Sequence, residues 1–443
     1  MSENILDKES ITSLFFKYSI PAVAGMLFLG LNVLLDGFFV GHYIGINALA
    51  SVNIAMPFSS LMLAIGVIIG IGTQSNIGRM LGEGKHQEAG DAFKTALILI
   101  TGISFLLLIL AVGFTRPIAA FLGASEDLMP MVASYIGYVG LFLPFFGIMF
   151  VLDYVLKVMG KPFYSMLVLI VSVLSHMMLN YFLIVRLGLG IRGAALATGI
   201  SYVVAFIMAI VPFITGKTAL KLGQGSFKKG LAFDIIYNGS PEGLSEIGTG
   251  VTTFLFNITL MRYVGEAGVA AFTAISYLSF IGNNILIGLS DGVGAIISYN
   301  YGGGKMERVK KAVRLAGFSA IVIGSGLFII IILFARELMG IFLEANYEQV
   351  LNLAVYGGSL YAGAFLVNGL NIVASGYFTA IGDPRRSAFI ALNKGIVWIG
   401  IGIVLLPFFF GIKGIWLTVP VAEMLTLVLS TAMLYKHFAG MGE

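Results

Sequence analysis

Residues 14–40 read LFFKYSIPAVAGMLFLGLNVLLDGFFV, an apolar stretch long enough to cross the roughly 30 Å hydrocarbon core of a bilayer as one α-helix. Similar stretches recur through the rest of the chain. Of its 443 residues, 58% are hydrophobic and 11% are charged, whereas soluble domains carry about 25% charged residues. Because no single water-soluble core could bury so much apolar sequence, the chain is predicted to be an all-α membrane protein.

Twelve transmembrane spans are expected, joined by short loops. The predicted spans cover residues 14–40, 48–76, 93–115, 130–156, 163–186, 193–215, 236–262, 268–298, 312–334, 349–380, 387–410 and 414–436. The longest polar interruption, residues 216–235, is predicted to be a cytoplasmic linker. It would separate an N-terminal six-helix lobe, residues 1–215, from a C-terminal six-helix lobe, residues 236–443.

The composition also narrows the classes of function. The chain has no cysteine, which excludes disulfide frameworks, thiolate metal sites and cysteine nucleophiles. Its net charge of +4 is modest, and no basic tract with interleaved aromatic residues appears, so no nucleic-acid partner is expected. No metal or organic cofactor is predicted. The N-terminal residues lack the basic region and cleavage site of a signal peptide, so the first span is expected to stay in the mature protein.

The basic residues of the loops predict the orientation in the membrane. With the N-terminus inside, only six of the 26 Lys and Arg residues fall in outside loops, namely Arg116, Arg186, Arg192, Arg262, Arg336 and Lys413. Lys394 lies within a span, and the remainder lie in inside segments. Because cytoplasmic loops are enriched in Lys and Arg, both termini are predicted to be cytoplasmic. The chain is expected to be a monomer in the cytoplasmic membrane, surrounded by its lipids.

The two halves of the sequence resemble each other when one is shifted by 220 residues, so that Pro21 falls on Pro241 and Lys85 on Lys305. Further matches, some with one or two added residues, are Tyr43 with Tyr263, Gly72 with Gly292, Gly137 with Gly358, MGKP at 159–162 with IGDP at 381–384, and GIRG at 190–193 with GIKG at 411–414. Because each half has an even number of spans, the repeats should be parallel and related by an axis along the membrane normal.

Two related bundles with a cleft between them favour transport by alternating access. Pro21 and Pro241 occupy equivalent positions in the first helix of each half, where a proline weakens the helix locally. Both are candidate helix-bending points, although prolines at an ordinary helix entry would give the same pattern.

Ionisable residues within the spans are candidates for function because charge at membrane depth is costly. Asp36 lies in LNVLLDGFFVG, with Asn32 one turn earlier. It follows Lys17 by nineteen residues, about 28 Å along a helix, which places it in the outer half of the bilayer. A carboxylate removed from water binds a proton more readily. Asp36 is therefore the first candidate for ion coupling, and a structural carboxylate held by Asn or Tyr neighbours is the alternative.

A second polar stripe comes from His176 and Asn180, one turn apart in SHMMLNYFLIV. Asn180 follows Lys161 by nineteen residues, the same depth as Asp36, and Thr198 lies about 9 Å in from the outer face on the returning helix. These residues can therefore lie at one level in the N-terminal lobe. For His176 alone, a hydrogen-bonded packing role is the alternative to a proton role.

The other intramembrane charges are candidate substrate-cavity residues. Glu242 and Glu246 share a helix face and would not both ionise readily, so they could attract a cation, unless Glu242 is simply hydrated near the cytoplasmic interface. Lys394 and Glu423 fall near mid-depth in the last two spans, where an ion pair is the simpler interpretation and a coupling role the alternative. Asp291 lies in the inner half of span 8.

The repeat does not extend to this polar chemistry. Asp36 aligns with Phe256, while His176 aligns with Trp398. The two halves share a scaffold without sharing ionisable groups, so ion coupling is expected to be concentrated in the N-terminal lobe.

Four segments resemble the multidrug and toxic compound extrusion (MATE) transporters, and the resemblance covers essentially all of residues 10–436. The segments are IPAVAGMLFLGLNVLLDGFFVGHYIG in span 1, GIRGAALATGISY entering span 6, LIGLSDGVGAIISYNYGGGK ending span 8 and ASGYFTAIGDPRRS after span 10. The details are most similar to the prokaryotic DinF-like and MepA-like branches. The resemblance implies twelve helices in two six-helix lobes, and export of amphipathic, often cationic, organic compounds in exchange for inward H⁺ or Na⁺.

The resemblance also implies roles for particular residues. The aspartate of the family's first span matches Asp36, its bend-associated proline matches Pro21, and its span 6 threonine matches Thr198. Members of this branch often carry Asn and then Asp four residues later in span 5, where this chain has His176 and Asn180. Because Na⁺ prefers anionic oxygen ligands, the missing carboxylate favours proton coupling through Asp36 with His176 as its partner. Na⁺ coupling is the alternative.

Other classes of protein stay open at the level of sequence. A flippase for a lipid-linked precursor could use a similar fold, but it would need a more basic cavity than one intramembrane lysine provides. An intramembrane enzyme is disfavoured, because no HExxH or paired catalytic aspartate motif appears and the chain has only four His. A channel would need a filter-like repeat, and none is visible. The chain is therefore predicted to be a transporter and not an enzyme.

Overall fold

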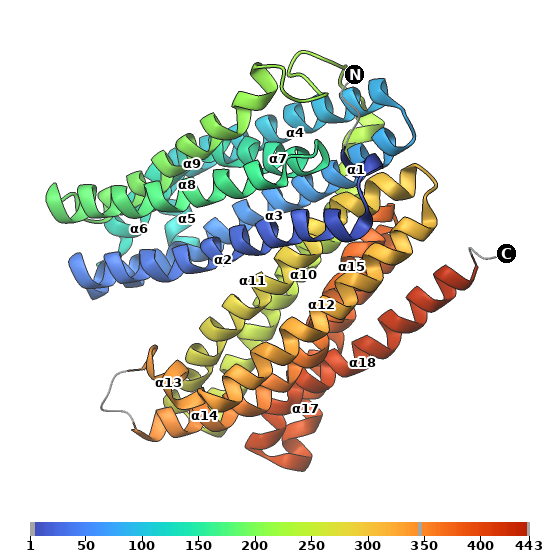
Figure 1. Ribbon diagram of the computed structural model, residues 1–443. Helices are drawn as coiled ribbons and strands as arrows, with labels where there is room; N and C mark the ends of the chain where they lie inside the picture. The colour runs from blue at the N-terminus through green and yellow to red at the C-terminus, as the bar shows by residue number, and fades with distance from the viewer. Residues whose placement is uncertain (1–4, 344–347, 441–443) are drawn as a thin grey trace.

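The computed structural model describes residues 5–343 and 348–440, and all regular secondary structure within those ranges is helical. Figure 1 shows two helical bundles, one from each half of the chain. The bundles meet at the end of the molecule that carries the N-terminus and diverge toward the opposite end. The described chain therefore has a V-shaped outline with its two arms pointing away from the N-terminus.

The N-terminal bundle contains, within the described residues, six helical segments that correspond to the first six predicted spans. The short helices α1 (Ile5–Lys8) and α5 (Thr115–Phe121) accompany them. The six segments are α2 (Ile11–Tyr43), α3 (Ile46–Gly82), α4 (His86–Gly113), α6 (Met129–Gly140) with α7 (Leu143–Val158), α8 (Pro162–Asn180) with the π-helix η1 (Tyr181–Arg186), and α9 (Gly190–Ile214).

The C-terminal bundle repeats this order. Its first three segments are α10 (Lys229–Tyr263), α11 (Glu266–Gly302) and α12 (Met306–Leu333), followed by the short helix α13 (Ala335–Gly340). The fourth segment consists of α14 (Glu348–Tyr361), the 3₁₀ turn η2 (Ala362–Ala364) and α15 (Phe365–Ile381). The fifth consists of α16 (Pro384–Leu392), the π-helix η3 (Asn393–Val397) and α17 (Trp398–Phe410), and the sixth is α18 (Ile412–Ala439). Helix α10 begins inside the segment that the sequence predicted as linker, because Ile235 is already buried against α3.

Four of the spans are not regular α-helices. Helices α6 and α7 meet at 50°, and Pro144 lies at the start of α7, directly after the break. The π-helical segments η1 and η3 belong to spans 5 and 11, and η2 interrupts span 10. Segments of π-helix are frequent at functional sites. Here η1 follows Asn180 directly, and η3 contains Lys394.

Helix α10 is the most polar of the predicted spans. Within the described residues, ten helical segments are each long and apolar enough to cross a membrane, and the bent pair α6–α7 would be an eleventh. Helix α10 is long enough but carries Asp234, Glu242 and Glu246. It packs along α3 of the other bundle, so one of its faces contacts protein instead of lipid. Polar side chains are tolerated at such an interface more easily than in contact with lipid.

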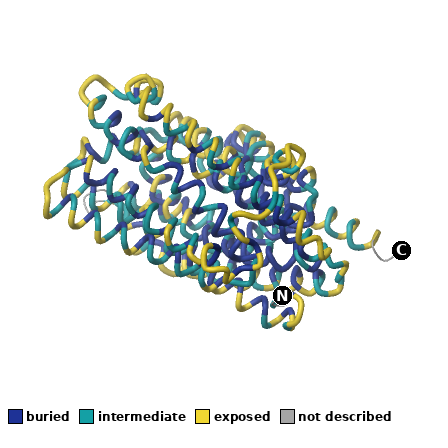
Figure 2. The backbone as a smooth tube through the Cα atoms, turned by 90° about the horizontal axis from the view of Figure 1, so that it is seen from above, coloured by how far each residue is buried: buried dark blue, intermediate teal, exposed yellow. Residues whose placement is uncertain are grey.

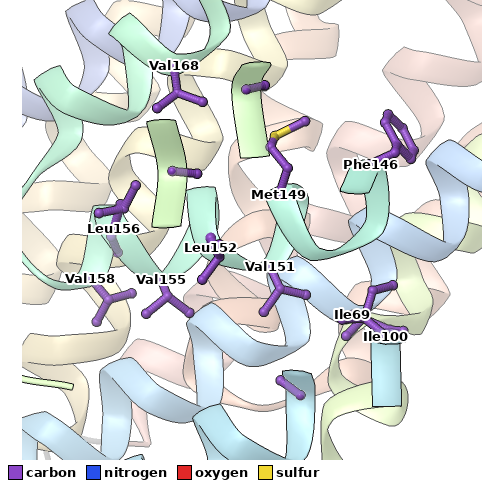
Figure 3. Close-up of a cluster of buried hydrophobic side chains, with 14 of the residues drawn as sticks. Ile69, Ile100, Phe146, Met149, Val151, Leu152, Val155, Leu156, Val158 and Val168 are labelled. Atoms are coloured by element: carbon purple, nitrogen blue, oxygen red, sulfur yellow. The ribbon is translucent and has the colours of Figure 1, made fainter. Parts of the chain in front are cut away.

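The N-terminal bundle has an apolar core around α7. Val151, Leu152 and Val155 of α7 belong to one apolar cluster with Ile69 of α3 and Ile100 of α4, and Figure 3 shows Val151 as the nearest of the three to the two isoleucines. Each of these five side chains is at most 2% exposed. Figure 2 shows that buried residues lie inside the bundles and exposed residues follow the outer faces. Helix α7 is therefore packed into the apolar core of the N-terminal bundle.

The two bundles touch through glycines at the end that carries the N-terminus. A Cβ atom on Gly72 would lie 1.9 Å from the carbonyl oxygen of Ile235 in α10. A Cβ atom on Gly82 would lie 2.0 Å from the carbonyl oxygen of Tyr299 in α11. Because only glycine allows two backbones to approach this closely, the helix ends of the two bundles are fitted to each other at these points.

Candidate ion-coupling site and neighbouring polar networks

Three helices of the N-terminal bundle bring the five predicted ion-coupling residues together. Asn32 and Asp36 project from α2, His176 and Asn180 from the last turns of α8, and Thr198 from α9. Helix α8 packs against both α2 and α9. The side chains lie in the half of the bundle that points away from the N-terminus of the chain.

His176 is the centre of this cluster and is 3% exposed. Its Nδ1 lies 2.9 Å from Asn32 Oδ1, and its Nε2 lies 3.1 Å from Thr198 Oγ1 and 3.4 Å from Asp36 Oδ1. Asn180 Nδ2 donates a hydrogen bond of 3.1 Å to Asp36 Oδ1 and lies 3.3 Å from His176 Nε2. The five side chains therefore form one hydrogen-bonded network.

The partners of the imidazole determine where its protons lie. Because the carbonyl oxygen of Asn32 can only accept, His176 Nδ1 must donate to it. In a neutral imidazole the other nitrogen, Nε2, then carries a lone pair, to which Asn180 Nδ2 can donate at 3.3 Å. Thr198 Oγ1 lies 3.1 Å and Asp36 Oδ1 3.4 Å from the same nitrogen. The network therefore brings a carboxylate and an imidazole close together.

One oxygen of the network has no partner. Asn180 is only 1% exposed, and its Oδ1 makes no hydrogen bond within the described residues. A buried amide oxygen usually finds a donor. This oxygen lies at the junction of α8 and η1. Asp36 Oδ1 lies beside it, because it accepts a hydrogen bond from Nδ2 of Asn180. An amide oxygen beside a carboxylate is also a suitable ligand pair for a small cation.

Two tyrosines belong to the surroundings of Asp36 and were missed at the sequence level. Tyr135 in α6 and Tyr202 in α9 both lie within electrostatic reach of Asp36. Tyr135 is buried, and Tyr202 packs on the ring of Phe146 at 4.6 Å between centroids. Because a tyrosine in an apolar span carries no charge, the pattern of charged residues within the spans does not reveal these two.

The predicted cavity residues do not form one cluster. Lys394 and Glu423 make an ion pair of 3.6 Å inside the C-terminal bundle, and Lys394 Nζ also donates to Asn368 Oδ1 at 2.7 Å. Asn371 Nδ2 donates to Glu423 Oε2 at 2.7 Å. Asn368 and Asn371 were not selected from the sequence. Their spacing of three residues on one helix face was the available signal.

Asp291 lies instead at the interface between the bundles. Its Oδ2 accepts a hydrogen bond of 3.2 Å from the hydroxyl of Tyr154 in α7. Lys157, also in α7, pairs with Asp153 at 3.0 Å, and all of these side chains are buried. They line a narrow void, partly open to solvent, which also borders Pro21 of α2.

The two glutamates of α10 differ in exposure. Glu242 is half-buried and lies within electrostatic reach of Asp291 and Lys394. Glu246, one turn later, is exposed. Helices α2 and α10 continue through their prolines, Pro21 and Pro241, without an interruption of the helix.

Fold and site together define a polytopic helical membrane protein with two related bundles and a buried ionisable cluster in one of them. The sequence model of the family described as MatE matches residues 21–182 and again residues 241–408, once in each half. The chain therefore belongs to the MATE family of membrane transporters. The two matches start at residues that differ by the shift of 220 found in the sequence itself.

Curated relatives and solved structures agree with this placement. The chain is 26% identical over 439 residues to the multidrug export protein MepA of Staphylococcus saprophyticus, which covers 97% of this chain and 94% of that protein. It is 25% identical over 436 residues to the MepA protein of Staphylococcus aureus, with the same coverage.

Two solved structures have the same fold. A MOP superfamily transporter from Pyrococcus furiosus superposes with a TM-score of 0.93 at 22% identity, covering 99% of this chain and 98% of that one. A multidrug resistance MATE family transporter in an outward-facing conformation also gives 0.93, at 21% identity, with the same coverage. The predicted family, its MepA-like branch and the twelve-helix fold are confirmed.

Proposed function

We propose that this protein is an antiporter that exports amphipathic, often cationic, organic compounds across the cytoplasmic membrane in exchange for protons. Relatives named as multidrug export proteins match over nearly their whole length, which supports export of such compounds. The observation that carries proton coupling is the approach of His176 Nε2 to Asp36 Oδ1 at 3.4 Å, with Nδ1 committed as a donor to Asn32.

The charged surface supports a cytoplasmic position for the end where the bundles meet. This end carries the loops between α3 and α4 and between α11 and α12, which contain Lys85 and Lys305, and Arg308 follows in the first turn of α12. Cytoplasmic loops are enriched in such residues. The arms of the V then diverge toward the outside. Asp36, whose side chain is 17% exposed, would exchange its proton with the external solution.

In the proposed cycle the proton and the compound alternate. A compound released to the outside leaves Asp36 ionised, and a proton from outside then binds between Asp36 and His176. Loss of the carboxylate charge changes the contacts between α2 and α8, and Pro21 gives α2 a local weak point about which it can adjust. The bundles then separate at the cytoplasmic end, where the proton leaves and a new compound enters.

The C-terminal bundle would contribute to compound binding. Glu246 is exposed on α10 and Glu242 lies one turn deeper, so both can attract an organic cation. Lys394 is held by Asn368 and Glu423 and is only partly exposed, which leaves little positive charge to repel such a compound. We expect the protein to work as a monomer among the lipids.

Sodium is a second candidate for the coupling ion because of the unpartnered oxygen of Asn180 beside Asp36. The experiment that distinguishes the two ions is export of a fluorescent organic cation in proteoliposomes, with a pH gradient and a Na⁺ gradient imposed separately. We expect the pH gradient alone to drive transport. Transport that responds only to the Na⁺ gradient would refute proton coupling.

A further inference from the structure

The segment before the first helix of the N-terminal bundle is held by the C-terminal bundle. The N-terminal strap, residues 5–10, has a fully buried Leu6. Arg308 of α12 donates from Nη2 to the carbonyl oxygens of Leu6 and Glu9, both at 2.9 Å. Lys305 forms an ion pair with Asp7. A guanidinium that satisfies two carbonyl groups and a buried leucine beside them make this a specific docked contact.

The same strap is rigidly connected to α2. Ser10 caps the helix by accepting a hydrogen bond of 3.3 Å from the amide of Ser13. Glu9 accepts 3.1 Å from the Ser13 hydroxyl and pairs with Lys17 at 2.6 Å. Arg308 is itself positioned by Asn300 of α11, which accepts from its Nε at 2.6 Å. Any movement of α2 relative to α11 and α12 must therefore break the strap contacts.

The segment before the first helix of the C-terminal bundle docks on the N-terminal bundle, through different contacts. In this linker strap, residues 224–228, the amide of Ser226 donates to Asp91 Oδ1 at 2.7 Å, and the amide of Lys228 donates to Thr95 Oγ1 at 3.0 Å. Asp91 and Thr95 belong to α4. Gly225 has φ of +82°, and a Cβ there would lie 2.4 Å from the carbonyl oxygen of Gly90.

The two straps are related by the internal repeat. Helix α4 corresponds to α12 under the 220-residue shift, and α2 corresponds to α10. In each case the strap before the first span of one bundle contacts the third span of the other bundle. We propose that the two straps are a pair of latches that hold the bundles together at the cytoplasmic end, and that both must release before the transporter opens to the cytoplasm.

This inference rests on the alternating-access function proposed above, but not on the identity of the coupling ion. The latch contacts join the bundles at the end where the glycine contacts also lie, so they stabilise the arrangement seen here and would be absent once the bundles separate at that end. Weakening a latch must therefore favour the cytoplasm-open arrangement. Fixing a latch covalently must block the cycle.

The first test measures access to the closed end. Ser298 of α11 is fully buried opposite Gly78 of α3. Because the chain has no native cysteine, Ser298→Cys provides a single reporter for a membrane-impermeant maleimide. In purified protein we expect Arg308→Gln to raise the labelling rate at least about tenfold, the effect of losing charge-assisted hydrogen bonds. Arg314→Gln, an exposed arginine on the same helix, is the matched control.

The linker strap is tested with the same reporter. Asp91→Ala removes the acceptor of the Ser226 amide and should raise labelling in the same direction. Equal labelling rates for the two latch variants and the Arg314→Gln control, in protein that elutes as folded material, would overturn the proposal. No substrate or ion gradient is needed, so this outcome is independent of whether protons are the coupling ion.

The second test fixes the latch and does not depend on a weakened variant folding. Asp7→Cys with Lys305→Cys joins the N-terminal strap to the C-terminal bundle through a short cleavable bismaleimide. Arg336→Cys with Glu348→Cys, at an ion pair of 2.5 Å within the C-terminal bundle, is the control. We expect cross-linking of the first pair alone to reduce export at least about tenfold, with recovery after cleavage. Export equal to that of the control pair would overturn the proposal.

Discussion

A single added methyl group at Gly82 tests the glycine contact between the bundles. A Cβ atom there would lie 2.0 Å from the Tyr299 carbonyl oxygen and 2.7 Å from the Gly303 nitrogen, both in the other bundle. Real Cβ atoms do not come closer than about 3.0 Å to such atoms, so the helices must move apart by about 1 Å. Gly82→Ala is therefore expected to destabilise the closed cytoplasmic end by about 1–3 kcal/mol.

This cost applies only to the arrangement in which the bundles touch at that end. The ratio of cytoplasm-open to cytoplasm-closed molecules should therefore rise by about 5- to 150-fold, since about 1.4 kcal/mol corresponds to a factor of ten. The assay is double electron–electron resonance between spin labels on Gln87→Cys and Glu307→Cys. These exposed positions lie on α4 and α12 and correspond under the repeat.

The matched control for this prediction is Gly102→Ala in α4, because no atom lies within 4 Å of a Cβ there. We expect the control to give the distance distribution of the unmodified protein and Gly82→Ala to gain a longer-distance population. If the two variants give the same distribution, the glycine contact does not determine the closed state, and the reasoning is wrong.

Three further changes follow from the polar networks. His176→Gln keeps a side-chain donor but no titratable nitrogen, and we expect export driven by a pH gradient to fall at least about tenfold, while detergent stability changes little. Lys394→Met leaves buried Glu423 without its ion-pair partner. It should cost about 3 kcal/mol of unfolding free energy, visible as a lower Tm that Glu423→Gln restores. Tyr154→Phe removes the hydrogen bond to Asp291. It should cost about 1 kcal/mol, measured in the same thermal assay.

The sequence was sufficient for the twelve-helix membrane fold and for the common level of Asp36 and Asn180. Apolar length is imposed by the bilayer, and helices that cross it rise by a constant distance per residue. Counting from Lys17 and Lys161 therefore placed Asp36 and Asn180 at one level, and the structure joins their side chains by a hydrogen bond. The assignment of these residues to ion coupling stays a proposal.

The remaining features depend on the rotation of each helix about its axis, which depth does not determine. The partners of Lys394 and Glu423 come from Asn368 and Asn371 on a third helix. The spacing of the two asparagines shows that they share a helix face, but it does not show which residues that face meets. The position of Asp291 opposite α7 is a contact between bundles and has the same origin. The docking of the straps likewise arises only when the two bundles pack against each other, because each strap contacts the bundle that it does not lead into.

The central claim is that Asp36 and His176 bind the proton that is exchanged for the exported compound. It is tested most directly by recording the lumenal pH of proteoliposomes with a trapped dye when an organic cation is added to the outside. With wild-type protein and no Na⁺, uptake of the compound should raise the lumenal pH, and Asp36→Asn, although folded, should give no pH change. A compound-dependent pH change of unaltered size in Asp36→Asn would contradict the account.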